Sequence, residues 1–140
     1  MKKLLIVFLM ILSACTPKPQ YYLYLYYAKT CPVCKSFINN VIPELEKEYG
    51  SQIEIIKYDI DDESSLEKYA RTCSLLKDYY ADDNSGSIPL IVLDGYFAQV
   101  GYEIGEEEKM LQTFRDAIEG KNILNNAREI YEFQDGKTFR

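Results

Sequence analysis

The sequence predicts an α/β fold in which a central mixed β-sheet is flanked by helices. Two observations support this prediction. Runs of apolar and β-branched residues alternate along the chain with segments whose apolar residues recur at helical spacing. The last two predicted strands are joined by Asp94-Gly95, a sequence typical of tight hairpin turns, so the sheet should contain an antiparallel pair. The expected order of elements is β-α-β-α-β-β-α.

The first predicted strand is the tyrosine-rich run 21–27, which is apolar or aromatic on both faces, as in a central strand. A tyrosine platform for a ligand is the less favoured interpretation of this run. A helix follows over 35–49, with apolar residues at helical spacing and Gly50 at its end. Pro43 lies inside this helix and should kink or split it.

Residues 53–60 are predicted to form the second strand, because they contain several β-branched isoleucines. The acidic cluster over 59–63 does not match a calcium loop, and we interpret it as a solvated strand end, so no metal site is expected. Residues 64–80 read as the second helix. Cys73 lies on its apolar stripe and is expected to be a small buried residue. A third redox cysteine is the alternative role for Cys73.

The second half of the chain completes the expected domain. Its predicted elements are a loop (82–87), two strands (88–93 and 96–100) and a helix (106–119). Gly120 should end the last helix. We expect residues 21–120 to form one domain and residues 121–140 to form a C-terminal extension, with a short helix over 122–131 packed on that domain.

The N-terminus is typical of an export signal over residues 1–14. Two lysines precede an unbroken apolar run of nine residues, 4–12, which is too short to span a bilayer. The sequence Leu12-Ser13-Ala14-Cys15 resembles the bacterial lipobox. That resemblance implies cleavage before Cys15, lipidation of its sulfur and stable membrane anchoring by two or three acyl chains. Residues 15–20 would then be a lipid-anchored tether. An ordinary signal peptide followed by an incidental cysteine is the alternative.

Composition excludes several function classes. Without the two lysines of the leader, the chain carries 14 basic and 22 acidic residues, a net charge of −8, which argues against binding to nucleic acid. The chain contains no histidine, which removes Cys/His zinc sites, histidine-assisted copper sites and Cys-His proteases. We expect a monomer in the bacterial cell envelope, outside the cytoplasm, with no metal and no cofactor other than a cysteine pair.

That pair is Cys31-Pro32-Val33-Cys34, placed where the first strand ends and the first helix begins. Unpaired N–H groups and the positive end of the helix dipole should stabilise a thiolate on Cys31. Pro32 suits the first helical position, and Lys29 and Lys35 add positive charge. Cys34 lies about one helical turn away, close enough to form a disulfide with Cys31.

With the cysteine pair at the first strand-to-helix junction, the element order resembles the thioredoxin superfamily over about residues 21–119. Cys31-Pro32-Val33-Cys34-Lys35 matches the redox motif of that family, and Ser87-Ile88-Pro89 resembles its cis-proline loop. The resemblance implies a cis Ile88–Pro89 bond against the cysteines and substrate binding at Ile88, Pro89 and Gly101. Leu25 stands where thioredoxins carry a buried acid, so water or Lys35 would have to assist proton transfer.

These residues predict a membrane-anchored thiol–disulfide oxidoreductase acting on exported proteins. Cys31 is the expected nucleophile, Cys34 the resolving cysteine, and Pro32 and Val33 tune the potential. The absence of histidine between the cysteines favours a reductant over an oxidant, because histidine stabilises the thiolate in the strong periplasmic oxidants of the family. A reductant in this compartment needs a membrane thiol-redox partner as electron donor.

Two other functions compete with this prediction. The chain could be a surface-tethered binding module whose Cys31–Cys34 disulfide is structural, since an exported location permits such a bond. It could also be a thiolate metal carrier that uses the pair together with Cys73. If Cys73 is buried on its helix, it cannot reach the cysteine pair to bind a metal with it.

Overall fold

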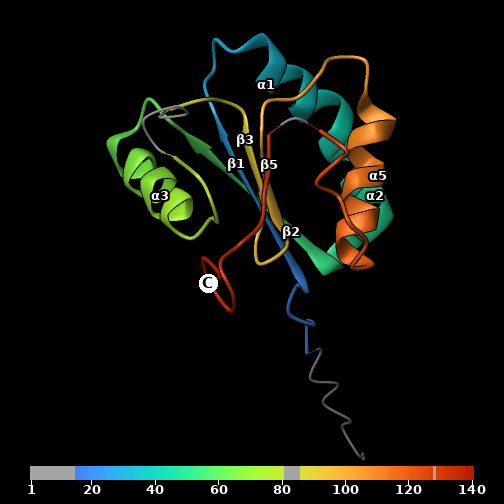
Figure 1. The fold of residues 1–140 in the computed structure, drawn as a ribbon. Coiled ribbons are helices and arrows are strands. Elements are labelled where there is room, and N and C mark those ends of the chain that lie inside the picture. The colour runs from blue at the N-terminus through green and yellow to red at the C-terminus, as the bar shows by residue number, and fades with distance from the viewer. Residues whose placement is uncertain (1–14, 81–85, 128) are drawn as a thin grey trace, which may run out of the picture.

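A computed structural model of the chain describes residues 15–80, 86–127 and 129–140. The predicted signal segment 1–14 lies outside the described residues, as does most of the predicted loop 82–87. Figure 1 shows a central sheet with helices on both of its faces. The α/β class and the mixed sheet expected from the sequence are therefore present.

Within the described residues, the sheet has five strands in the spatial order β2-β1-β3-β4-β5. The strands are β1 (Tyr21–Tyr27), β2 (Ile53–Asp59), β3 (Leu90–Leu93), β4 (Phe97–Val100) and β5 (Ile130–Tyr131). β1 and β2 are parallel, whereas every other neighbouring pair is antiparallel. The tight turn at Asp94-Gly95 joins β3 to β4 as predicted, with Gly95 in the left-handed region at φ 76°.

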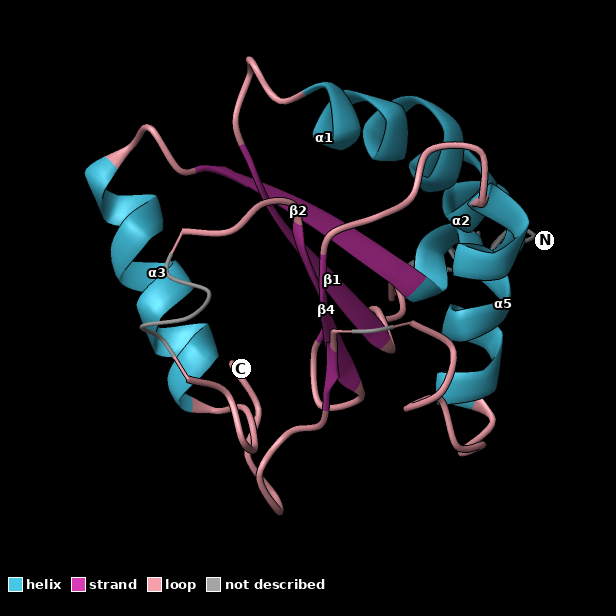
Figure 2. Cartoon of the chain, turned by 45° about the horizontal axis from the view of Figure 1, so that its top comes forward, coloured by secondary structure: helices cyan, strands magenta, loops and turns pink. Residues whose placement is uncertain are grey.

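The helical elements divide between the two faces of the sheet. They are α1 (Pro32–Ser36), a π-helical turn (Phe37–Val41), α2 (Ile42–Tyr49), a short 3-10 turn (Gly50–Gln52), α3 (Glu63–Ser74) and α5 (Glu107–Ile118). In Figures 1 and 2, α3 lies on one side of the sheet, and α1, α2 and α5 lie on the other.

The sheet has an apolar core on each face, and alternate side chains of β1 point into one or the other. Leu23 and Leu25 face the α1, α2 and α5 layer and are fully buried. Tyr24 and Tyr26 face α3 and are almost fully buried as well. A strand that is covered on both faces has no need for a polar alternation, which explains the continuous apolar run in the sequence.

Pro43 interrupts the regular α-helical winding of the predicted helix over 35–49, where a kink or a split was expected. A proline cannot donate a backbone hydrogen bond, and its ring clashes with the preceding turn of an α-helix. The chain places Pro43 in the first turn of α2 and widens the preceding turn to π geometry, in which the Ile42 N–H bonds to the Phe37 carbonyl. The helix therefore continues from Pro32 to Tyr49 with one local change of winding.

The second predicted helix, 64–80, is wrong at its C-terminal end, because α3 stops at Ser74. The residues after it pair with the C-terminal segment instead. Leu76 forms a β-bridge with Phe133, and the Lys77 N–H bonds to the Glu132 carbonyl at 2.8 Å. Long-range backbone pairing therefore replaces the helical turns that local periodicity predicted.

The predicted helix over 122–131 is also wrong. Its described residues form turns followed by β5, which pairs with β4 through Gln99 and Ile130. Asn122 favours a turn, because its side-chain oxygen accepts a hydrogen bond from the Leu124 N–H at 3.0 Å. Residues 130–131 instead add an edge strand to the sheet beside β4, and the described residues of 122–131 form no helix.

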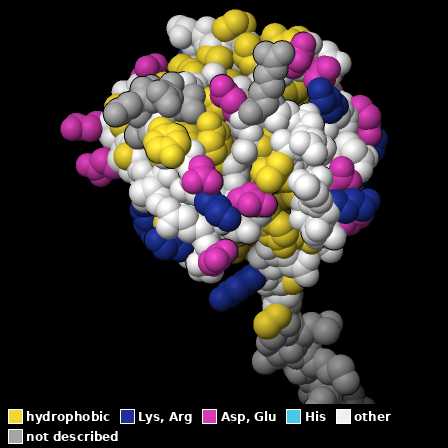
Figure 3. Space-filling model, in the orientation of Figure 1, with side chains coloured by type: hydrophobic (Ala, Val, Ile, Leu, Met, Phe, Trp, Pro, Cys, Tyr) yellow, Lys and Arg dark blue, Asp and Glu magenta, His cyan; other side chains and the backbone are white. Residues whose placement is uncertain are grey.

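The surface carries both signs of charge. On the face drawn in Figure 3, lysine and arginine side chains are interspersed with acidic ones, and apolar side chains lie between them. Among the helices of residues 15–80, 86–127 and 129–140, none has the length and apolar character to cross a bilayer.

Candidate functional site

The cysteine pair lies at one end of the sheet, where β1 leads into α1. Cys31 is the N-cap of α1 and Pro32 is its first residue. Cys31 and Cys34 form a disulfide, with their Cα atoms 5.3 Å apart. Helical winding sets this separation, because residues three apart lie on the same side of a helix.

A backbone N–H in the first turn of α1 donates a hydrogen bond to the Cys31 sulfur. The Cys34 N–H donates to the Cys31 Sγ at 3.1 Å, as a capping interaction. This N–H belongs to the first turn of a helical segment that continues to Tyr49, so the positive end of its dipole also faces the Cys31 sulfur. Both effects favour negative charge on Cys31 when the disulfide is open.

The two sulfurs differ in their access to solvent. Cys31 is half-buried, whereas Cys34 is fully buried beneath α1. Val33, between them, packs against the core that contains Leu23 and Leu25. Of the two cysteines, Cys31 is therefore the one that an external thiol or disulfide can approach directly.

The predicted positive charge near the pair is only partly available. Lys29 forms an ion pair with Asp59 at 3.3 Å, and this carboxylate raises the pKa of Lys29. Lys35 lies exposed in the last turn of α1. Leu25, at the position where a buried acid could assist proton transfer, is fully buried in the apolar core.

The register of the sheet brings the predicted substrate-binding residues to the same end. Tyr26 in β1 pairs with Leu90 in β3, so the residues just before β3 lie beside the end of β1 that leads to Cys31. The Ile88–Pro89 peptide bond there is cis. The Gly101 N–H bonds to the Pro89 carbonyl at 2.8 Å, which places Gly101 at this end as well.

Gly101 is required by the conformation of the backbone. Its φ of 82° lies in the left-handed region, while a Cβ atom at this position would meet no other atom within 4 Å. The open space above Gly101 leaves room for another chain to approach.

Cys73 lies apart from the pair. It packs with Tyr24, Tyr26 and Tyr69 on the α3 face of the sheet, opposite to the layer that contains α1. Burial raises the pKa of its thiol, so Cys73 is a poor nucleophile. Among the described residues, no group of three or more Cys, Asp or Glu side chains could hold a metal ion. Cys15, the predicted lipidation site, is a free and exposed cysteine.

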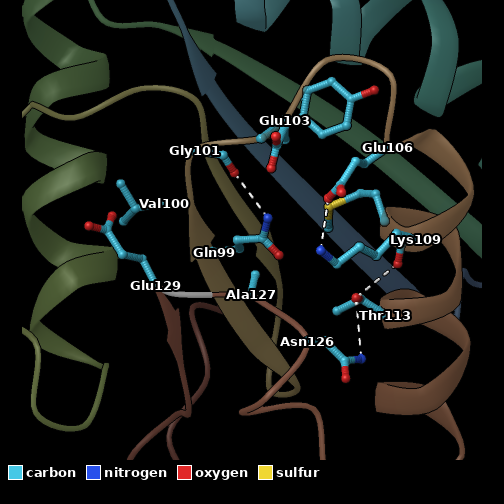
Figure 4. Close-up of a pocket in the computed structure, with 12 residues that line it drawn as sticks. Gln99, Val100, Gly101, Glu103, Glu106, Lys109, Thr113, Asn126, Ala127 and Glu129 are labelled. Carbon is cyan, nitrogen blue, oxygen red and sulfur yellow. Dashed lines mark hydrogen bonds and ion pairs between the residues drawn. The ribbon is translucent and has the colours of Figure 1, made fainter.

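A cavity of about 650 Å³ was not anticipated from the sequence. It lies between β4, α5 and the segment that leads to β5, and Figure 4 shows its lining. Gln99 projects into it from β4 and is 7% exposed. The only sequence signal for this site is an amide side chain inside an otherwise apolar strand.

Comparison with known proteins assigns no family. No protein family matches the sequence, and no curated protein matches it either. A solved structure described as that of a malarial protein is similar, with 21% identity and a TM-score of 0.48 over 71% of this chain and 98% of the other. A similarity at this level carries no conclusion about family or function.

Proposed function

We propose that the protein is a thioredoxin-like thiol–disulfide oxidoreductase that is held at the bacterial envelope by lipid on Cys15. The observation that carries this proposal is the Cys31–Cys34 disulfide at the start of α1, with only Cys31 accessible. A half-buried cysteine whose sulfur accepts a hydrogen bond from the Cys34 N–H suits attack, and a fully buried neighbour suits resolution.

The proposed reaction transfers two electrons between the pair and a substrate disulfide. In the reducing direction, the Cys31 thiolate attacks one substrate sulfur, and the other leaves as a thiolate. The Cys34 thiol then loses its proton and attacks the Cys31 Sγ, which releases the second substrate thiolate. The pair is oxidised to the disulfide, the substrate is reduced to two thiols, and a membrane thiol-redox partner returns the electrons.

The arrangement of the sheet end supports a polypeptide substrate. Ile88, Pro89 and Gly101 lie at the end of the sheet from which Cys31 emerges, and the space above Gly101 is open. An extended segment of an exported protein could approach there and place its disulfide beside Cys31. The buried Leu25 leaves Lys35 or water as the group that removes the proton from Cys34.

Redox titration of the full chain in an uncharged detergent tests the proposal. We expect the couple to equilibrate with dithiol buffers at a potential nearer to about −270 mV, the value of a reductant, than to about −120 mV, the value of a strong oxidant. A pair that stays closed below roughly −300 mV, or that exchanges too slowly to equilibrate, would identify a structural disulfide in a binding module and contradict the proposal.

Matched cysteine variants test the roles of the two sulfurs. Cys31→Ser should abolish disulfide exchange with a model substrate, because the accessible sulfur is lost. Cys34→Ser should accumulate a mixed disulfide on Cys31, because the resolving sulfur is lost. Cys73→Ser is the control and should exchange like the unmodified chain, since Cys73 lies on the other face of the sheet. Retained exchange in Cys31→Ser would contradict the assignment.

A further inference from the structure

The cavity between β4 and α5 contains a buried hydrogen-bond acceptor without a partner. Gln99 is buried, with only 7% of its surface exposed, and its Oε1 receives no hydrogen bond from the described residues. A buried polar atom of this kind is uncommon, because an unmade hydrogen bond is unfavourable by an amount comparable to its desolvation. The atom faces the cavity rather than the packed core (Figure 4).

A hydrogen bond from the Nε2 atom fixes the orientation of the Gln99 side-chain amide. Its Nε2 donates to the Gly101 carbonyl at 3.1 Å. A rotated amide would direct its oxygen at that carbonyl, and two acceptors cannot bond to each other. Oε1 therefore has to face the cavity, where it can be satisfied only by a donor.

The rim of the cavity carries net negative charge. Glu103 and Glu106 contribute carboxylates, and Lys109 contributes one ammonium group, which pairs with Glu106 at 2.8 Å. Glu106, followed by Glu103, raises the pKa of Lys109, so this group remains charged. The side chain of Glu129 points to the other side of the sheet (Figure 4). An anion is disfavoured at such a rim, and a cation is favoured.

The Lys109 side chain lies between Gln99 and solvent and can move away from it. This side chain is 56% exposed, forms an ion pair with Glu106 and reaches from α5 across the space toward Gln99 (Figure 4). Exposed lysine side chains change rotamer readily, so Lys109 can turn outward without disturbing the fold. Met110, from the same helix, gives the cavity an apolar wall.

From these features we propose that the cavity binds a primary alkylammonium group. Its N–H donors reach Gln99 Oε1, its charge is balanced by Glu103 and Glu106, and its alkyl chain lies against Met110. The incoming group takes the place of the Lys109 ammonium. A lysine side chain of a polypeptide and a free amine present the same chemistry and are the two sources of such a group. Neither cysteine of the pair lines this cavity, whereas Gly101, one of the residues proposed to seat the redox substrate, lies at its edge. Amine binding itself does not require the redox function of the pair.

A pair of probes tests the requirement for N–H donors. The full chain in an uncharged detergent is titrated with n-butylammonium and with n-butyltrimethylammonium, and the amide signals of Gln99 and Gly101 are followed by NMR. The two probes have the same charge, but only the first can donate. We expect a dissociation constant on the order of 1 mM for the first probe and at least about tenfold weaker binding for the second. Equal binding of both probes, or no binding of either, would overturn the proposal.

Two variants test the residues. Gln99→Met keeps the size of the side chain and removes the acceptor, so n-butylammonium binding should fall about tenfold. Lys109→Met removes the competing ammonium, so binding should become tighter. Gln112→Met on the outer side of α5 is the control and should bind like the unmodified chain. Thermal unfolding of each variant confirms that it is folded. Unchanged affinity in both Gln99→Met and Lys109→Met would overturn the proposal and leave water as the occupant.

A third comparison distinguishes the two sources. Nα-acetyl-lysine methylamide carries the ammonium group on a peptide backbone, whereas spermidine is a free amine. Tighter binding of the lysine derivative than of n-butylammonium would support a polypeptide source, and tighter binding of spermidine would support a free amine. Repeating the titration with Cys31→Ser keeps this test independent of the redox proposal, because amine binding should persist in that variant.

Discussion

Tyr26 and Thr72 form a polar pair in the core between the sheet and α3. Their hydroxyl oxygens are 2.8 Å apart, and both residues are 0% exposed. Burial raises the pKa of Tyr26 far above its usual range, so the phenol stays protonated. Tyr26→Phe should therefore leave the Thr72 hydroxyl buried without this partner, and urea unfolding should show a loss of about 1–3 kcal/mol.

The double variant provides the control for this prediction. Tyr26→Phe with Thr72→Val removes both hydroxyls and keeps the shape of the core, so part of the lost stability should return. If the two single effects simply add, the hydrogen bond contributes no coupling and the interpretation is wrong.

Some residues of the candidate sites could be predicted from the sequence, and others could not. Cys31, Pro32 and Cys34 could be assigned from their spacing, because helix winding is a local property that places residues three apart together. Gln99 could not, since its burial depends on α5 and on the segment before β5, both distant in sequence. The ion pair of Lys29 with Asp59 was also missed, because it depends on the register of β1 with β2.

At the scale of elements, Arg115 joins the two helices that cover one face of the sheet. From α5, its Nε and Nη2 donate to both carboxylate oxygens of Glu48 in α2 at 2.9 and 3.0 Å, and its Nη1 donates to Glu108 at 2.7 Å. Arg115→Met should destabilise the protein by about 1 kcal/mol at neutral pH, the upper end for a pair that is about one third exposed. Chemical denaturation measures the difference.

The same pair predicts a dependence on pH. The hydrogen bonds from Arg115 hold the pKa of Glu48 below its usual value of 4.5. A carboxyl whose pKa is lowered by folding contributes stability above its unfolded pKa and loses it as the pH falls through the folded pKa. The difference between Arg115→Met and the unmodified chain should therefore shrink as the pH falls below 4.5. A constant difference down to about pH 2 would contradict this origin.

Element boundaries show where local signals suffice. The change of helical winding before Pro43 could be predicted, because proline acts on the turn that precedes it. The end of α3 could not, because Leu76 and Lys77 are drawn into pairing with residues more than fifty positions later. The helix predicted over 122–131 was wrong for the same reason, because part of this segment pairs with the edge of β4.

At the scale of the whole molecule, the order of elements could be predicted up to residue 120, because each buried strand and each amphipathic helix has its own periodicity. The path of the C-terminal segment could not. Its last residues lie on the face of the sheet that α3 covers. There Phe139 packs against Tyr24, and Arg140 stacks over Tyr22 at 4.1 Å from the ring centre. Polar residues in this segment gave no periodic signal, and the contacts form only after the sheet exists.

Asp94 anchors this segment and gives the last prediction. Its two carboxylate oxygens accept hydrogen bonds from the backbone N–H groups of Phe139 and Arg140 at 2.7 and 3.1 Å. Because these bonds involve a charged acceptor, Asp94→Ala should lower the free energy of unfolding by about 1.5–3 kcal/mol. The amides of Phe139 and Arg140 should also exchange with solvent much faster by NMR.

Two further variants separate anchoring from the turn in which Asp94 lies. Asp94→Asn keeps a residue that suits the turn before Gly95 but retains only one acceptor, so it should release the segment partly and cost less stability than Asp94→Ala. Asp135→Ala, at an exposed acid in the same segment, is the matched control and should leave the exchange of both amides unchanged. If Asp94→Asn keeps the full protection of Phe139 and Arg140, the carboxylate is not the anchor, and the aromatic contacts of Phe139 and Arg140 with Tyr24 and Tyr22 hold the segment by themselves.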